Sequence, residues 1–315
     1  MCNKKIPLLV IAGPTASGKT KLAVDMALKF NGEVVSADSM QIYKYMNIGT
    51  AKPDIEEMCG VKHYMLDFLE PDDKFSVAEY VKEAKEHIHD IYLRGKLPIL
   101  AGGTGLYINS VIDNVEFSDA GENTEIRHQL HKIADEKGNE YLFEMLRKVD
   151  PELCETLHPN NVGRVVRAIE VYKTTGKNMT WHKAHSKEKP SDYNFCMIGL
   201  TCDDRQKLYD RINKRVTIMA EKGLIEEAKE LFSSIYAGTA KQAIGYKELK
   251  AYFDGRDTLE NCLDKIRMET RRYAKRQLTW FRRDERINWI KTDLYENYDN
   301  ILKEAVEILE NSHIL

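Results

Sequence analysis

The chain has 315 residues, of which 43% are hydrophobic and 31% charged, with a formal net charge of −3. This composition describes an ordinary soluble protein of about two domains, whose core needs no metal or disulfide. Its six cysteines contain no CxxC pair and no run approaches about 18 apolar residues, so we expect reduced thiols, a cytoplasmic location and no transmembrane helix.

The first third of the chain alternates predicted strands and helices. Residues 6–12 (IPLLVIA) predict a buried strand, residues 19–30 a helix and residues 33–39 a second strand. Residues 76–94 predict a helix that opens with an S-x-x-E capping box. Residues 98–103 (PILAGG) predict another short buried strand, so the pattern indicates a parallel, doubly wound sheet.

The rest of the chain is mostly helical. Residues 115–185 are polar, show no clear strand pattern and predict an inserted helical segment. Residues 194–200 and 287–291 predict two more strands. Between them, residues 203–232 predict a long helical stretch that is interrupted at Gly223.

A phosphate-binding motif follows the first predicted strand. The octapeptide GPTASGKT satisfies GxxxxGK[ST], in which glycines let backbone N–H groups turn toward an anion at the positive end of a helix. The lysine supplies a point charge, and the last threonine offers its hydroxyl to a phosphate-bound Mg²⁺. The expected phosphate-binding residues are Gly13, Pro14, Thr15, Ala16, Ser17, Gly18, Lys19 and Thr20.

These elements together predict an α/β fold. We expect a P-loop NTPase-like parallel sheet flanked by helices, carrying a helical insertion domain. Residues 1–114 and 186–315 are expected to form the core with its C-terminal helices, and residues 115–185 the insertion.

The strand that usually supplies a metal-binding Asp in an NTP hydrolase is here LPILAGGTG, which has no carboxylate. The carboxylate lies instead on the other strand, as Asp38 in VVSADSMQIY. Because ligands of open α/β sheets sit at the carboxyl ends of the strands, Asp38 is expected beside the phosphate loop. From the residues alone, Asp38 is a metal ligand, a general base or a helix cap.

The order of six motifs resembles that of the tRNA dimethylallyltransferases, also called tRNA isopentenyltransferases. The motifs are GPTASGKT, VVSADSMQIYKYMNIGTAKP, ILAGGTGLYI, HPNNVGRVVRAIEVY, QAIGYKEL and TRRYAKRQLTWFRR. They span residues 13–283, nearly the whole chain. The chain resembles the compact bacterial form, without the C-terminal zinc finger of many eukaryotic relatives.

The resemblance implies transfer of a dimethylallyl group from dimethylallyl diphosphate to the exocyclic N6 amine of adenosine-37 in tRNA, with release of diphosphate. The phosphate loop would then hold the donor's diphosphate, with Lys19 and a Mg²⁺ near Thr20 stabilising its developing charge. Asp38 matches the family's proposed base, and Thr104 matches a residue near the acceptor. Arg211 and Arg215 share a helix face and either close over the diphosphate or pair with nearby acids.

The resemblance also implies contacts with the tRNA anticodon stem-loop, whose target base must leave its stack to reach a buried reagent. A monomer is expected to make them. The expected tRNA-contacting residues are Asp38, Ser39, Met40, Gln41, Thr104, Arg127, Gly163, Arg164, Val165, Val166, Arg167, Gln242, Ala243, Ile244, Gly245, Tyr246 and Lys247.

A basic stretch, KIRMETRRYAKRQLTWFRR, occupies residues 265–283 and has eight basic residues against one acid. Such a helix is commonly only a solvated face, but in a protein of net charge −3 this concentration favours contacts with a phosphate backbone, through Arg272 and Arg276 among others.

Read as a helix, the basic stretch places Ile266, Tyr273 and Trp280 seven residues apart, and we expect them to form its buried stripe. Trp181 and Trp289 are likewise expected in the core and not as stacking platforms for bases.

Two other functions compete with the transferase. A kinase could use the same loop for ATP, but this leaves the basic stretch and QAIGYK without a role. An RNA-binding module with a purely structural phosphate loop predicts tRNA binding that Asp38→Asn does not affect, and no turnover.

Overall fold

The computed structural model describes residues 5–117, 121–186, 188–233 and 239–315. The chain divides into two compact units, one formed by Met1–Ile112 with Asp192–Leu315 and the other by Asp113–Ser191. The expected insertion of residues 115–185 lies within the second unit. Among the described residues, no helix has the length and apolar character needed to cross a membrane.

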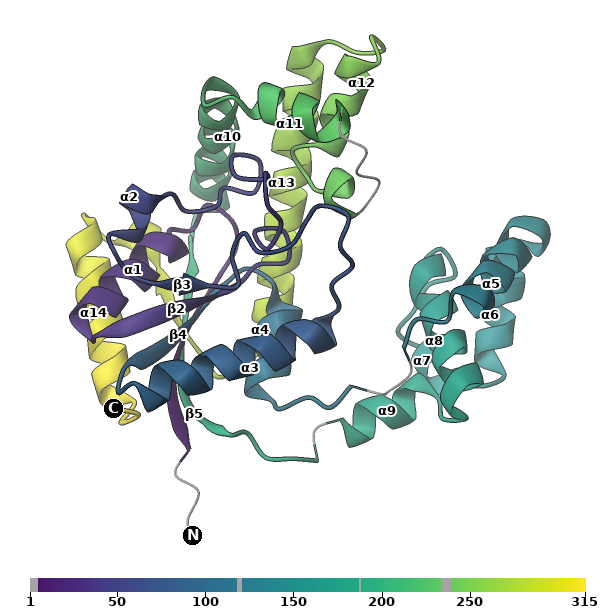
Figure 1. Ribbon diagram of the computed structural model, residues 1–315, viewed down its shortest axis with the longest axis horizontal. Coiled ribbons are helices and arrows are strands. Elements are labelled where there is room, and N and C mark those ends of the chain that lie inside the picture. The colour runs from purple at the N-terminus through teal and green to yellow at the C-terminus, as the bar shows by residue number, and fades with distance from the viewer. Residues whose placement is uncertain (1–4, 118–120, 187, 234–238) are drawn as a thin grey trace. The chain divides into compact units, whose positions relative to one another are not determined.

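The first unit is built on one parallel sheet (Figure 1), which confirms the predicted fold class. The strands lie in the order β3-β2-β4-β1-β5-β6. Their bounds are β1 Ile6–Ala12, β2 Gly32–Ala37, β3 His63–Tyr64, β4 Leu97–Gly102, β5 Tyr193–Thr201 and β6 Ile287–Lys291.

Two details of the strands differ from the sequence prediction. The two-residue strand β3 was not predicted, because two residues are too few to show a period. The predicted strand at residues 33–39 extends too far: β2 ends at Ala37, and the chain turns where Asp38 accepts hydrogen bonds from the N–H groups of Met40 and Gln41. Asp38 therefore belongs to a loop.

Helices cover both faces of the sheet. Helices α3 (Val77–Leu93) and α4 (Gly105–Ile112) pack on one face, and α1 (Lys19–Lys29) and α14 (Tyr298–Asn311) on the other. The capping box predicted at the start of α3 is confirmed. The Ser76 side chain accepts from the Glu79 N–H, and the Glu79 carboxylate accepts from the Ser76 N–H. Strand β1 is buried from both sides, which explains its unbroken apolar sequence.

A group of helices gathers at the carboxyl end of the sheet (Figure 1). The interruption predicted at Gly223 is confirmed, since this glycine has a φ of 103° and separates two helices. A hydrophobic cluster that includes Ile42, Met46 and Tyr246 joins these helices to the loop after β2. The helices are α10 Arg205–Glu221, α11 Leu224–Ser233, α12 Lys250–Phe253 and α13 Leu259–Phe281.

The shorter elements of the first unit lie in its connections. They are α2 Ile55–Met58 and the 3₁₀ turns Thr239–Gln242, Lys247–Leu249 and Thr292–Leu294.

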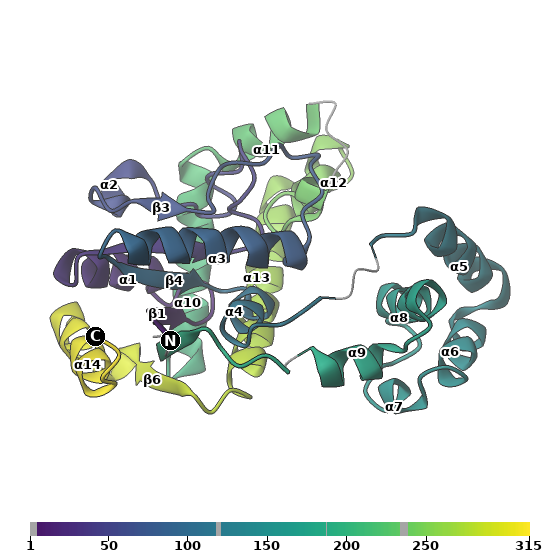
Figure 2. The same ribbon diagram turned by 60° about the horizontal axis from the view of Figure 1, so that its bottom comes forward.

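The second unit is helical, and its described residues contain no strand, as predicted. Helix α8 packs against α5 and α6 (Figure 2), and its Val165 and Val166 are buried in the small core of this unit. The helices are α5 Thr124–Lys137, α6 Asn139–Arg147, α7 Pro151–Cys154, α8 Val162–Thr175 and α9 Met179–His185.

The predicted buried stripe of α13 is wrong in part. Ile266 is buried, but Tyr273 is half-buried and the Trp280 side chain is 42% exposed. Trp280 lies near the end of the helix, where its indole N–H donates to Asn109 Oδ1 at 3.2 Å and its ring packs against Gly105 of α4, which leaves the rest of the side chain exposed. The residues that form this face are Cys262, Leu263, Ile266, Ala274, Gln277, Leu278 and Phe281.

Of the other two tryptophans, which were also predicted in the core, one is exposed and one is partly buried. Trp181 is 40% exposed and stacks on His185 with ring centroids 4.1 Å apart, so its expected place in the core is wrong. Trp289 is partly buried and packs against a small cluster of α10 and α13 side chains.

Candidate active site

Three strands of the sheet end at the same level. The register pairs Ala12 of β1 and Ala37 of β2 with Gly102 of β4. The residues that follow, Gly13 and Asp38 among them, therefore emerge side by side at the carboxyl edge of the sheet, where open α/β sheets bind ligands.

The phosphate loop is held in a conformation that requires glycine. Gly13 has a φ of 146°, and a Cβ on it would lie 2.5 Å from the carbonyl oxygen of Leu200. Gly18 is the N-cap of α1 in a left-handed conformation, and no side chain caps the helix there. The N–H groups of the first turn of α1 have no side-chain cap, so they can bind an anion.

Lys19 lies in the cleft beside this loop. Its Nζ donates to the carbonyl oxygen of Pro14 at 2.6 Å. Burial and the positive charge of Arg215 lower the pKa of Lys19 to about 7, against an opposing contribution from Asp38. An anionic ligand would relieve this crowding of positive charge, so the site is suited to a phosphate group.

Gln277 of α13 clamps the phosphate loop to the end of β4. The Thr15 N–H donates to Gln277 Oε1 at 2.9 Å, and Gln277 Nε2 donates to the Gly103 carbonyl oxygen at 2.9 Å. Gln277 is only 6% exposed, and a Cβ on Gly103 would lie 2.2 Å from its Nε2. This residue was not predicted, since its role depends on neighbours far away in the sequence.

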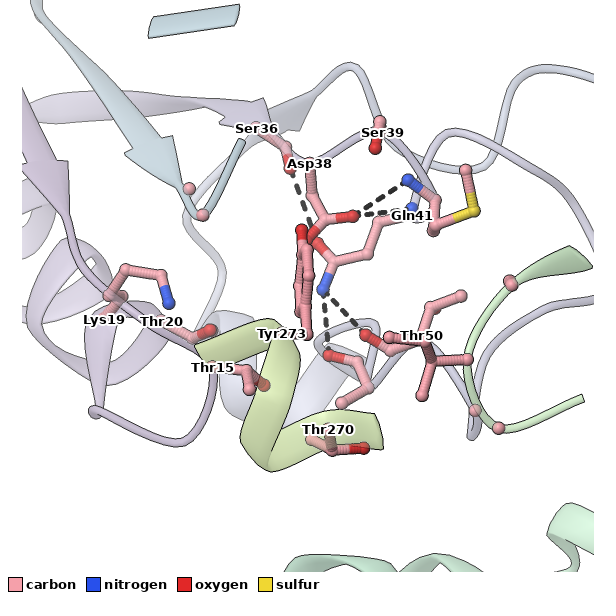
Figure 3. A pocket seen from close by; sticks show the side chains of 18 of the residues that line it. Thr15, Lys19, Thr20, Ser36, Asp38, Ser39, Gln41, Thr50, Thr270 and Tyr273 are labelled. Carbon is pink, nitrogen blue, oxygen red and sulfur yellow. Dashed lines mark hydrogen bonds between the residues drawn. The ribbon is translucent and has the colours of Figure 1, made fainter. Parts of the chain in front are cut away.

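Asp38 and Thr104 stand on adjacent loops above the sheet. Asp38 Oδ1 accepts the N–H groups of Met40 at 2.9 Å and Gln41 at 3.3 Å (Figure 3). Thr104 N–H donates to the Ala37 carbonyl oxygen at 3.0 Å, and Thr104 Oγ1 accepts the Ser39 N–H at 3.1 Å. Asp38 Oδ1 therefore closes a turn and caps no helix, and the residue lines the cleft described next.

A cleft of about 370 Å³ joins the phosphate loop to Asp38. Lys19 and Thr20 line it at one side, Asp38 and Tyr273 in the middle (Figure 3). Burial and the charge of Asp38 raise the pKa of Tyr273, which keeps its phenol protonated. The sequence did not single out Tyr273 as a site residue. Apolar side chains that also line the cleft are Met40, Ile212, Val216, Met219, Ala243, Ile244 and Ile266.

Arg211 and Arg215 of α10 face different hollows. Arg215 lines the cleft, and its Nη1 lies 3.3 Å from Thr15 Oγ1 in the phosphate loop. Arg211 donates to Thr292 Oγ1 at 2.9 Å and lines a second hollow behind the loop. The structure therefore brings Arg215 to the front of the phosphate loop, and Arg211 to its back.

The QAIGYK segment divides between cleft and core. Residues 242–245 line the cleft. Tyr246 has no exposed surface, and its hydroxyl donates to Glu227 Oε1 at 2.6 Å. Lys247 is exposed. An RNA contact from this segment would therefore have to involve residues other than the Tyr246 side chain.

In the second unit, a buried carboxylate binds two of the expected RNA contacts. Glu170 has no exposed surface and accepts from Arg127 at 3.0 Å, from Arg167 at 2.8 Å and from the Asn123 N–H at 2.7 Å. Burial alone would raise the pKa of Glu170, but these donors lower it. Gly163 and Arg164 are exposed on the same helix.

The basic helix is partly neutralised by its own neighbours. Arg272 pairs with Glu269 at 2.6 Å, and Arg267 with Asp264 at 2.6 Å. Arg276 lines the cleft, with its guanidinium 5.7 Å from the centre of the Tyr273 ring. Arg276 is therefore the basic residue of α13 that lies at the site itself.

A divalent metal would draw few ligands from this protein. The described residues contain no group of three or more His, Cys, Asp and Glu that could hold one. Thr20 is exposed at the start of α1, which fits a Mg²⁺ that is held mainly by phosphate oxygens and water.

The phosphate loop, whose conformation requires glycine, shares one cleft with the carboxylate of Asp38 at the carboxyl edge of a parallel sheet. This arrangement defines a P-loop α/β protein that acts on a phosphate-bearing substrate. A model of the IPP transferase family matches residues 41–284. The chain belongs to the IPP transferase family.

Known proteins of this kind are similar over nearly the full length. A tRNA dimethylallyltransferase of Acetivibrio thermocellus is 53% identical over 298 residues, which cover 94% of this chain and 95% of the relative. The crystal structure of a tRNA isopentenylpyrophosphate transferase from Bacillus halodurans has a TM-score of 0.72 at 44% identity and covers 98% of both chains. A eukaryotic dimethylallyltransferase acting on tRNA has a TM-score of 0.82 at 29% identity, covering 95% of this chain and 77% of that one.

Proposed function

We propose that this protein transfers a dimethylallyl group from dimethylallyl diphosphate to tRNA, at the exocyclic N6 amine of adenosine-37 beside the anticodon. The similarity to tRNA dimethylallyltransferases over 94% of the chain supports the reaction class. The observation that carries the proposal is the single cleft that joins the phosphate loop to Asp38. Donor and acceptor must meet in such a cleft for direct transfer.

The proposed reaction is a displacement at carbon. The amine nitrogen bonds to C1 of the dimethylallyl group, and the bond from C1 to the bridging diphosphate oxygen breaks. The electron pair leaves with diphosphate, whose charge would be stabilised by the N–H groups of the loop and by Lys19 and Arg215, which line the cleft. Neither water nor a hydrolytic carboxylate takes part, in keeping with the absence of a carboxylate from the sequence GGTG after β4.

Asp38 is the proposed acceptor of the amine proton. An adenine amine is a poor nucleophile, so a base within hydrogen-bond reach assists its attack. The bonds from Met40 and Gln41 fix one carboxylate oxygen of Asp38 and orient the other. Thr104, which bonds the neighbouring Ser39 N–H, supports the same loop.

The donor's diphosphate is proposed to bind with Mg²⁺. Thr20 would give its hydroxyl to the ion, and the ion would neutralise charge on the leaving group. The remaining ligands would be diphosphate oxygens and water.

The tRNA anticodon stem-loop is the proposed second partner, and its target base would enter the cleft away from the phosphate loop. Arg276 and residues 242–245 lie at the cleft, and Arg164 is exposed on α8. A flipped base needs such a lining of polar and apolar groups. The monomeric state and cytoplasmic location stay predictions.

The proposal is tested with purified protein, Mg²⁺, labelled dimethylallyl diphosphate and an unmodified anticodon stem-loop. Incorporation of label should require adenosine at the target position and should fall strongly, to a residual rate, in Asp38→Asn, while the exposed Asp210→Asn control retains it. If the wild type incorporates no label but consumes ATP and phosphorylates a small acceptor, the protein is a kinase and the proposed transferase function is wrong. If the wild type binds the stem-loop without any turnover, the protein is an RNA-binding module and not an enzyme of this kind.

A further inference from the structure

The wall of the cleft opposite the phosphate loop is a loop that follows β2. Gly49, Thr50 and Ala51 line the cleft. Outside the cleft, three successive N–H groups of this loop point to one side chain, the carboxylate of Glu227 on α11. The donors are Asn47 at 2.8 Å, Ile48 at 2.9 Å and Gly49 at 2.9 Å.

A fourth donor joins the same carboxylate from the QAIGYK segment. The Tyr246 hydroxyl donates to Glu227 Oε1 at 2.6 Å, and burial together with the Glu227 charge raises the pKa of Tyr246. The Tyr246 ring also packs against the loop, because a Cβ on Gly49 would lie 2.4 Å from Tyr246 Cζ. Glu227 therefore joins two segments that both line the cleft, although it does not line the cleft itself.

The same loop is held from inside the cleft by Gln41. Its Nε2 donates to the carbonyl oxygens of Thr50 at 3.2 Å and Ala51 at 3.0 Å (Figure 3). The backbone N–H of Gln41 donates to Asp38 Oδ1 at 3.3 Å. A continuous series of hydrogen bonds therefore runs from Glu227 through the loop and Gln41 to Asp38.

We propose that Glu227 is a positioning residue for the transfer reaction, acting through the loop 47–51 and Gln41 on the orientation of Asp38. This inference rests on the proposed function. A carboxylate suits the task because it accepts from all four donors, whereas any amide in its place would point its own N–H₂ group at one or more of them.

The distinguishing experiment measures transfer to the stem-loop in Glu227→Gln, with Glu226→Gln as the matched control. Glu226 is exposed and one residue earlier on α11. We expect kcat to fall by about tenfold to a hundredfold in Glu227→Gln, because a small misplacement of reacting groups has this effect. The KM for dimethylallyl diphosphate should stay within about twofold, since the phosphate loop is held by Gln277 instead.

A double-mutant cycle separates positioning from mere stability. If Glu227 acts through Asp38, Glu227→Gln should reduce the residual rate of Asp38→Asn by less than about twofold. Tyr246→Phe keeps the ring against Gly49 and removes one donor, so it should lower kcat in the same direction by a smaller factor. This variant also provides the test if Glu227→Gln does not fold.

Three results would overturn the inference. These are a kcat of Glu227→Gln equal to that of Glu226→Gln, full multiplication of its effect with that of Asp38→Asn, and a wild-type kcat in Tyr246→Phe. Absence of transfer by the wild type would instead contradict the proposed function, so the two failures are distinct.

Discussion

The Thr15 N–H of the phosphate loop and the Gln277 side chain of α13, 262 residues apart in the sequence, form a 2.9 Å hydrogen bond. The other end of the same amide binds the Gly103 carbonyl oxygen. The phosphate loop is therefore joined to the residue that follows β4 by a side chain of α13.

Gln277→Ala should lower both stability and diphosphate affinity. The change leaves a part-buried N–H of Thr15 and the buried carbonyl oxygen of Gly103 without this partner, and a buried group left unsatisfied costs about 1–3 kcal/mol of the free energy of unfolding. Urea unfolding and the shift in melting temperature with added pyrophosphate measure the two effects. Gln206→Ala, at an exposed glutamine of α10, should change neither by more than about 0.5 kcal/mol. A wild-type pyrophosphate response in Gln277→Ala would argue against the clamp.

Lys19→Met should stabilise the ligand-free protein most below about pH 7. The pKa of Lys19 is lowered to about 7 in the fold, so the folded state holds the charged form at a disadvantage. Between that value and its ordinary pKa of about 10.4, the unfolded chain binds more protons, and the stability of the wild type rises with pH. Melting temperatures at about pH 6, 8 and 10 should therefore show a difference between variant and wild type that shrinks as pH rises. A constant difference would contradict the lowered pKa.

Arg164→Ala and Arg167→Ala should separate RNA binding from stability. Arg164 is exposed, so its loss should weaken stem-loop binding, reduce the slope of log affinity against log salt by about 1 and leave the melting temperature unchanged. Arg167 pairs with the buried Glu170, so Arg167→Ala should also lower the melting temperature. Fluorescence anisotropy at several salt concentrations and thermal unfolding decide the matter. Arg147→Ala is the control, because Arg147 forms an exposed ion pair with Glu144 on α6.

Gly49→Ala should destabilise the protein by about 1–3 kcal/mol. The new Cβ would lie 2.4 Å from the buried Tyr246 ring, which cannot move without disturbing its bond to Glu227. Gly163→Ala is the matched control, because nothing lies within 4 Å of a Cβ at that helical position. This control should be neutral or stabilising, by up to about 1 kcal/mol. Equal melting temperatures for the two variants would contradict the packing of Gly49.

Local patterns in the sequence were sufficient to predict β1, the phosphate loop, the capped start of α3 and the late strand β6. These elements depend on neighbours in the chain, such as the Ser76 and Glu79 pair. The position of Asp38 beside the loop also follows, since parallel strands end at one edge. Gln277, Tyr273 and Glu227 could not be found this way, because each acquires its role from partners distant in sequence. The exposure of Trp280 depends on which elements cover that end of α13, and a seven-residue repeat does not show this.

The order of strands in the sheet has a consequence for synthesis. Strand β1 lies between β4 and β5, and β5 begins only after the whole of Asp113–Ser191 has been made. Between the end of β4 and the end of β5 the ribosome adds 99 residues (201 − 102), so a nascent chain carries β1 with an open edge for about 5–20 seconds at ordinary rates of elongation. An apolar open edge invites pairing with other chains. Polypeptides that terminate inside the helical unit keep this edge exposed, whereas the finished chain covers it with β5.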